Sequence, residues 1–150
     1  MKLAILAGAA LLCAAPAVDA ATYFRTSPST ILLPAGNTDT TIVEANVAAG
    51  TYQVQAVAIA QNAVDQFNAV FCDILYSTVN SPNNPPVASD TLTTGIGGGQ
   101  TYVGGVHMVG AVKLTTAGTI SLGCRQNNGT VNQLINVGSQ LLIVTAPALK

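Results

Sequence analysis

The sequence predicts an all-β fold, an antiparallel two-sheet β-sandwich that follows an N-terminal signal peptide. Apolar residues recur with a period of two along most of the chain, and Gly, Pro and Asn residues separate these stretches at short intervals. Beyond residue 20, no stretch keeps the 3.6-residue period of an amphipathic helix. Roughly eight or nine short strands joined by such turns are typical of a sandwich or a barrel.

The first 20 residues read as a secretory signal peptide. An uncharged apolar run, Leu3–Ala15, follows a lysine, and Val18 and Ala20 place compact residues where signal cleavage requires them. The run is too short to cross a hydrocarbon core of about 30 Å as a helix. We therefore expect cleavage after Ala20, a single domain over residues 21–150 without a transmembrane segment, and a secreted, periplasmic or cell-surface location. A membrane anchor, or lipid attachment at Cys13, is the alternative.

Three weaker strands open the predicted domain, at Thr22–Arg25, Ser29–Leu33 and Thr40–Val47. The clearest strand is Tyr52–Gln61, where apolar residues occupy every second position from the first and glutamines occupy much of the other face. Asn68–Ser77 alternates in the same way, so we expect it to be the neighbour of that strand in its sheet.

The second half of the domain continues this pattern. We expect strands at Asp90–Ile96, Thr101–Thr115, Thr119–Gln126, Thr130–Val137 and Gln140–Thr145. Gly104-Gly105 predicts a bulge or a close backbone approach within the longest of them. Asn127-Asn128-Gly129 predicts a tight hairpin turn, and Asn128-Gly129-Thr130 also matches an N-glycosylation acceptor. The segments 82–86 and 95–99, rich in Pro, Asn and Gly, are expected to be loops.

Cys72 and Cys124 are the two cysteines of the expected mature chain, and each lies on the apolar face of a predicted strand. In an oxidising compartment such a pair most often forms a disulfide. We therefore expect a structural bond between them across the interior of the domain. No Cys-x-x-Cys motif or activating neighbour indicates a redox-active pair.

The sequence carries no recognisable catalytic or metal-binding constellation. His107 is the single histidine, and neither a nucleophile motif nor a set of zinc ligands accompanies it, so it reads as an ordinary strand residue. Asp65, Asp73 and Asp90 are candidates for the paired carboxylates of a glycosidase, but nothing in the sequence brings two of them together. A calcium site of Asp90 with the asparagines of the loop 82–86 is a weaker alternative. We expect no enzyme activity, no metal and no cofactor.

Charge also limits the partners. Charged residues make up 7% of the chain and the net charge is −1, which leaves no basic surface for nucleic acid and no polybasic cluster for an anionic membrane. A surface of Thr, Ser, Asn and Gln with few lysines gives weak protection against self-association. A protein partner, a glycan partner and assembly of the chain with itself remain open.

Three segments resemble complement-type and tumour-necrosis-factor-like jelly rolls. Ala49–Val54 resembles the Gly-x-Tyr start of their central strand, and Val112–Ile120 resembles their hairpin Leu-x-x-Gly-Asp-x-hydrophobic, with Thr119 where Asp is usual. Ser139–Val144 corresponds to their final core strand. The resemblance implies a jelly roll and, as is common in that group, a homotrimer that recognises partners through loops or outer surfaces. An immunoglobulin-like sandwich is the rival, since Gly118–Cys124 is similar to the strand before its second cysteine.

The sequence therefore predicts an exported, non-enzymatic β-sandwich that acts by binding or assembly. A structural subunit of an extracellular filament or coat, similar to chaperone-assembled pilins, is the alternative. A secreted hydrolase is a more remote one.

Overall fold

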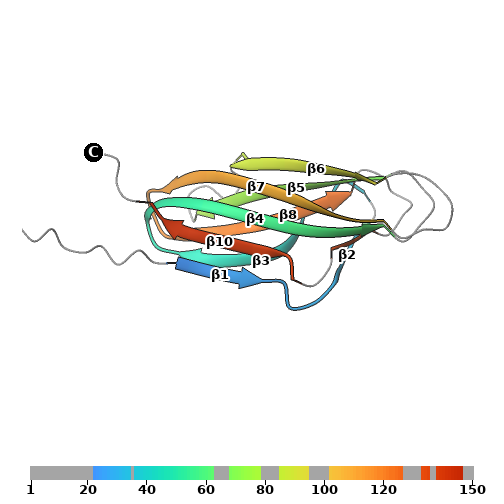
Figure 1. The fold of residues 1–150 in the computed structure, drawn as a ribbon. Coiled ribbons are helices and arrows are strands. Elements are labelled where there is room, and N and C mark those ends of the chain that lie inside the picture. The colour runs from blue at the N-terminus through green and yellow to red at the C-terminus, as the bar shows by residue number, and fades with distance from the viewer. Residues whose placement is uncertain are drawn as a thin grey trace, which may run out of the picture.

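Two antiparallel sheets packed face to face account for the strands of the described chain (Figure 1). The computed structural model describes residues 22–34, 36–62, 68–78, 85–94, 102–126, 133–135 and 138–146. Its strands are β1 (Thr22–Thr26), β2 (Ile31–Leu33), β3 (Thr40–Val47), β4 (Gly50–Asn62), β5 (Asn68–Thr78), β6 (Ala88–Thr94), β7 (Tyr102–Leu114), β8 (Gly118–Gln126), β9 (Gln133–Ile135) and β10 (Gln140–Thr145). The predicted all-β sandwich is confirmed. In these described ranges no helix has the length and apolar character needed to cross a membrane.

Sheet A is built around β4, the clearest strand of the sequence. One edge of β4 pairs with β7 along its whole length, and the other edge pairs with β10 and then with β9. β1 lies outside β10, and β2 lies outside β9. Sheet B has the order β3-β8-β5-β6. Among the described strands, β5 and β6 are the one consecutive pair bonded to each other, which is the arrangement of a jelly roll.

Three expectations about connections are wrong for one reason. β5 pairs with β8 and β6, and it is not a neighbour of β4. The turns before and after β8 do not close hairpins, because β8 belongs to sheet B while β7 and β9 belong to sheet A. Alternating side chains and turn residues define a strand locally, but the sheet that a strand joins is decided by partners far away in the sequence.

The bulge expected at Gly104-Gly105 is also wrong. β7 pairs with β4 in an unbroken register through both glycines, and the irregularity of the fold lies in β3, between Thr41 and Val43. Gly105 instead leaves room for a side chain on its own strand. A Cβ atom there would lie 3.0 Å from Nε2 of His107, two residues along the same face.

The core contains the inward-facing residues of both sheets. In β4 of sheet A the small side chains of Ala56, Ala58 and Ala60 are at most 2% exposed, while Leu141 and Ile143 of β10 and residues of sheet B such as Ile120 and Leu122 are fully buried larger ones. Small and large side chains together fill the space between the two sheets. Burial of each large aliphatic side chain contributes about 1.5–3 kcal/mol.

The gap between β9 and β10 is bridged by a serine side chain. Ser139 is fully buried, and its hydroxyl accepts a hydrogen bond of 3.1 Å from the backbone N–H of Ile59 in β4. The Ser27 N–H donates to the carbonyl of Ser139, and the Gly138 N–H donates to the carbonyl of Ser27. Gly138 has a φ of 88°, which favours glycine. The backbone N–H of Ile59 therefore remains hydrogen-bonded where β4 passes from its pairing with β10 to its pairing with β9.

Candidate interaction surface

The outer face of sheet A carries exposed apolar side chains. Phe24, Leu32, Val103 and Val109 are each more than half exposed. They lie on β1, β2 and β7, all strands of sheet A. Described residues of sheet B contribute no large apolar side chain of comparable exposure. The two outer faces of the sandwich therefore differ in their exposed apolar side chains, which among the described residues are concentrated on sheet A.

The strand register arranges these side chains in rows across the sheet. Phe24 pairs with Leu142, Leu142 with Gln55, and Gln55 with Val109. Directly paired residues place their side chains on the same face, so this row crosses all four strands from β1 to β7. A second row, six residues further along β4 and so about 20 Å away, joins β2 to β7.

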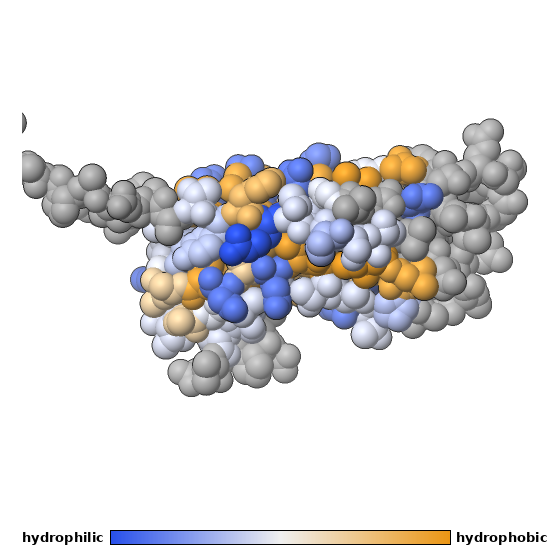
Figure 2. Space-filling model, turned by 90° about the horizontal axis from the view of Figure 1, so that it is seen from below, coloured by the Kyte–Doolittle hydropathy of each residue, from blue (hydrophilic) through white to orange (hydrophobic). Residues whose placement is uncertain are grey.

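The second row includes Leu32, Gln61 and Val103. Val57 and Ile59 of β4 lie between the rows and are partly exposed. We call this surface the sheet A face. Its members are the outward residues of β1, β4, β7 and β10 together with Leu32. Figure 2 views the molecule from below the orientation of Figure 1 and so looks onto the edge of the sandwich at β1, beside the sheet A face, where apolar side chains form a band between polar ones.

The sheet A face is almost free of charge. Its polar members are mainly glutamines, and Gln53, Gln55 and Gln140 are exposed. Among the described strands of sheet A there is no acidic residue, and the charged residue of the face is Lys113, near the end of β7. A glutamine amide both donates and accepts hydrogen bonds. Two copies of this face can therefore meet without repulsion between like charges.

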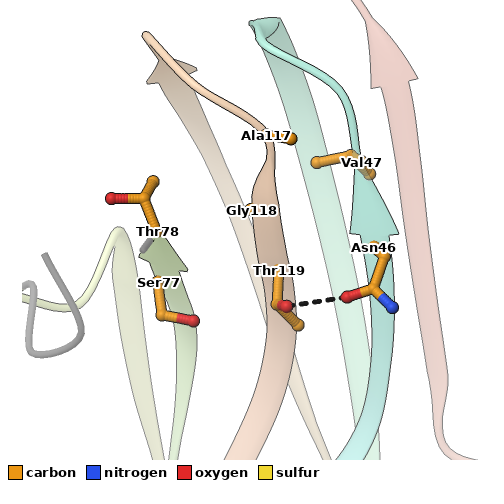
Figure 3. Close-up of a pocket in the computed structure, with 7 residues that line it drawn as sticks. All are labelled: Asn46, Val47, Ser77, Thr78, Ala117, Gly118 and Thr119. Atoms are coloured by element: carbon orange, nitrogen blue, oxygen red, sulfur yellow. Dashed lines mark hydrogen bonds between the residues drawn. The ribbon is translucent and has the colours of Figure 1, made fainter. Parts of the chain in front are cut away.

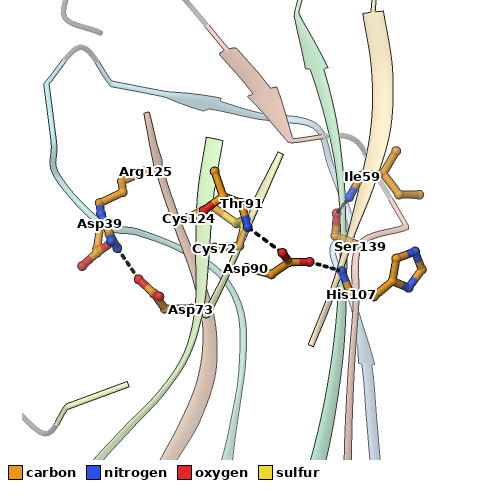
Figure 4. The surroundings of a disulfide bond; sticks show 10 residues. All are labelled: Asp39, Ile59, Cys72, Asp73, Asp90, Thr91, His107, Cys124, Arg125 and Ser139. Atoms are coloured by element: carbon orange, nitrogen blue, oxygen red, sulfur yellow. Dashed lines mark hydrogen bonds and ion pairs between the residues drawn. A yellow bond between two sulfur atoms is a disulfide. The ribbon is translucent and has the colours of Figure 1, made fainter. Parts of the chain in front are cut away.

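Cys72 and Cys124 are joined, as the sequence predicts, with an S–S distance of 2.08 Å (Figure 4). The place of the bond is different from the one expected. The two residues lie directly opposite each other on β5 and β8 of sheet B, so the bond joins neighbouring strands and does not cross the interior. An immunoglobulin-like sandwich places its bridge between the two sheets. Together with the strand order, this makes the immunoglobulin-like alternative wrong.

His107 lies on the sheet A face with its side chain exposed. Its backbone N–H, and not its ring, contacts Asp90, donating to Oδ2 over 3.2 Å, while the Thr91 N–H donates to Oδ1 over 2.8 Å (Figure 4). The carboxylate of Asp90 therefore satisfies backbone groups and does not orient the imidazole as a catalytic base would require.

Asp73 and Asp90, the two candidate aspartates that the structure describes, do not form a paired-carboxylate site. Asp90 pairs with Cys72, whose side chain is in the core, whereas Asp73 pairs with Ser89. Neighbouring residues of a strand point to opposite faces, so Asp73 and Asp90 lie on different sides of sheet B. Across the described ranges, no three His, Cys, Asp or Glu residues are grouped so that they could hold a metal ion.

Asp73 belongs to an ion cluster that the sequence reasoning missed. The guanidinium Nη1 of Arg125 contacts the carboxylates of both Asp73 and Asp39, and Arg125 also lies 5.4 Å from the ring centroid of Phe71. The hydrogen bond to Asp39 and then the one to Asp73 raise the pKa of Arg125. Asp73 is 3% exposed and needs this partner. The sequence feature that could have indicated this cluster is the position of Asp73 between Phe71 and Leu75 on one face of an apolar strand.

Several residues singled out in the sequence lie outside the described ranges. They are the signal segment, Asp65, Asn83 and Asn84, the glycine run 95–99 and the acceptor at Asn128.

No protein-family model matches the sequence, and no curated protein sequence is similar to it. The fold is similar to solved structures. Eiger TNF from S. frugiperda superposes with a TM-score of 0.62 at 9% identity, over 87% of this chain and 94% of that one.

Proteins of infectious bursal disease virus are also similar in fold. The T13 viral particle gives a TM-score of 0.55 at 13% identity over 84% of this chain, and the VP2 subviral particle gives 0.53 at 13% identity over 85%. This chain spans about a third of each viral chain, 31% and 33% respectively. At such identities the likeness concerns the fold alone, and it confirms the predicted jelly roll.

Proposed function

We propose that this chain is an exported, non-enzymatic jelly-roll protein that works as an assembly of identical copies, joined through the sheet A face. The observation that carries the proposal is the concentration of exposed apolar side chains on one face of the sandwich, whose charged residue among those described is Lys113. Such a patch on a protein surface marks an interaction site more often than a chance exposure.

The composition of the face favours a second copy over a different partner. Without acidic residues and with Lys113 at one end, the described face offers no charge pattern by which another protein would be selected. Glutamine amides and aliphatic side chains, in contrast, are complementary to themselves. The resemblance to tumour-necrosis-factor-like proteins predicts three copies.

The size of the face is sufficient for a stable assembly. With strands about 4.8 Å apart and a rise of about 3.3 Å per residue, the described strands of sheet A cover roughly 700 Å² in projection. A stable interface buries about 800 Å² of accessible surface on each partner. Side-chain relief raises the accessible area above the projected one, so the whole face is enough.

Export is proposed from the leader segment and from the disulfide. Cleavage after Ala20 would deliver residues 21–150 to an oxidising compartment, where the bond between Cys72 and Cys124 is stable. A secreted, periplasmic or cell-surface location follows. The similarity to a virus protein found in particles is consistent with an assembling role.

The pilin-like alternative has less support. In a donor-strand filament the N-terminal segment would leave its own domain to complete the sheet of a neighbour. Here β1 pairs with β10 and β2 pairs with β9 of the same chain. A coat built by face-to-face contact remains compatible with the proposal, and a hydrolase gains no support from the surroundings of His107.

Sedimentation velocity of the mature protein tests the proposal. We expect the wild type to sediment as more than one copy at micromolar concentration. Val109→Glu places a carboxylate at the β7 end of the row that crosses the face, and burying this charge without a partner is unfavourable, so the variant should sediment as a monomer. Thr41→Glu, at an exposed position of β3 in sheet B, is the matched control and should assemble as the wild type does.

Circular dichroism must show that both variants are folded. A wild type that stays monomeric at about 100 µM would overturn the proposal. At this concentration an interface with a micromolar dissociation constant would be largely occupied. Equal loss of assembly in Thr41→Glu would place the interface elsewhere.

A further inference from the structure

A pocket lies at one end of sheet B, where β3 and β5 end and β8 begins (Figure 3). Its volume is about 440 Å³, within the range of roughly 300–1,000 Å³ found for small-molecule sites. The lining residues come from three strands and one turn, and they are Asn46, Val47, Ser77, Thr78, Ala117, Gly118 and Thr119. The pocket is on the sheet opposite to the sheet A face.

Gly118 lies in the middle of the pocket lining. It pairs with Val47 on one side and with Thr78 on the other, so it occupies the middle of the last row of sheet B at this end (Figure 3). A Cβ atom at this position would collide with the carbonyl oxygen of Ser77. The close approach of β5 and β8 therefore requires glycine here.

The polar groups of the pocket are neutral and partly fixed in place. The Thr119 hydroxyl donates a hydrogen bond of 2.8 Å to Oδ1 of Asn46, which orients the amide (Figure 3). The hydroxyl of Ser77 points from the opposite strand toward β8 (Figure 3). Ala117, which is exposed, adds apolar surface beside these groups, whereas Val47 is 4% exposed and belongs to the core. Among the described residues that line the pocket, none is charged.

We propose that this pocket binds one sugar unit of a neutral carbohydrate. A sugar ring presents hydroxyls that donate and accept, together with C–H faces that pack on small apolar side chains, and this matches the lining. An anion would be drawn by Lys or Arg, which are missing here. A purely apolar ligand would cover hydroxyl and amide groups without bonding them, which is unfavourable. The proposal does not depend on assembly through the sheet A face.

Amide chemical shifts of the isotope-labelled mature protein test the proposal. The probes are the methyl glycosides of glucose, galactose, mannose and N-acetylglucosamine, with glucuronate and inorganic phosphate as charged counterparts. We expect at least one neutral glycoside to shift the amides of Gly118, Thr119 and Ser77 in a saturable way. We expect the charged probes to leave these amides unchanged.

Thr119→Val removes the hydroxyl that holds Asn46 while keeping the shape of the side chain. Loss of one neutral hydrogen bond should weaken binding about three- to tenfold. Thr41→Val, the same change at an exposed position on the other end of β3, should bind as the wild type does. Asn46→Ala gives a second test at an exposed residue, with the same weakening expected, if Thr119→Val does not fold.

Shifts of equal size in wild type and in both pocket variants would overturn the proposal. So would saturable shifts that the charged probes alone produce, or the lack of a response to any of the four glycosides. A responding sugar is then tested at the non-reducing end of a longer oligosaccharide. Tighter binding of the oligosaccharide assigns the site to glycan chains, and weaker binding assigns it to free sugars, both within the proposal.

Discussion

Removal of the disulfide should cost a large part of the stability of this fold. Cys72 and Cys124 are 52 residues apart in the sequence, and a bond that closes a loop of this length lowers the entropy of the unfolded chain by an amount worth about 4 kcal/mol. For a domain of about 130 residues this corresponds to a fall of roughly 15 °C in Tm. We therefore expect Cys72→Ala/Cys124→Ala to unfold at a much lower urea concentration than the wild type.

The single variants decide whether the cross-link is the cause. Either Cys72→Ala or Cys124→Ala already removes the bond, so each single variant should lose nearly as much stability as the double variant. The chain has no Trp, so urea unfolding is followed by far-UV circular dichroism, with the reduced wild type as a further control. Losses that add up between the two single variants, or a total loss below about 1 kcal/mol, would refute the entropic reasoning.

Three further predictions concern stability. Ser139→Ala leaves a buried ladder N–H without its acceptor, and urea unfolding should show a loss of about 1–3 kcal/mol. Asp73→Asn should cost about 1–3 kcal/mol in the same assay because it weakens the buried side of the Arg125 cluster, whereas Asp39→Asn, at the more exposed side, should cost less than about 1 kcal/mol. Burial, and less strongly the nearby Tyr23, raise the pKa of Tyr52 above 10.0. The folded protein therefore favours the neutral phenol, so the contribution of Tyr52 to the free energy of unfolding should be constant below about pH 10 and fall as the pH rises further. Tyr52→Phe should reduce this fall in urea titrations between about pH 8 and 11.

Much of the fold follows from local patterns. The even-numbered residues from Tyr52 to Ala60 are all apolar, and all of them are buried along β4. The strand expected at Asp90–Ile96 exists as β6, two residues earlier in the chain. Period-two burial is a property of each strand alone, and it can therefore be read from one segment at a time.

Properties that depend on pairing could not be read in this way. The sequence does not say that Cys72 lies opposite Cys124 in one sheet, since this follows from the register of two strands that are far apart in the chain. The same holds for the sheet A face. Phe24 and Val109 are ordinary outward residues in their own strands, and the register alone places them in one row.

The ion cluster shows the same limit. Arg125, Asp39 and Asp73 come from three distant parts of the sequence, and each is unremarkable by itself. Charge composition predicts that nucleic acid is not a partner, and that argument needs only the total number of charges. A site made by juxtaposition needs the topology.

Hydroxyl-radical footprinting of the wild type tests the assembly proposal most directly, because it reads the sheet A face residue by residue. Phe24 is 53% exposed in the isolated chain, and Phe71 in sheet B packs beside Arg125 and serves as the internal reference. If copies join through the sheet A face, oxidation of Phe24 should fall several-fold as the concentration is raised into the range of assembly, while oxidation of Phe71 stays constant. Unchanged oxidation of Phe24 in a sample that contains more than one copy per particle would contradict the account.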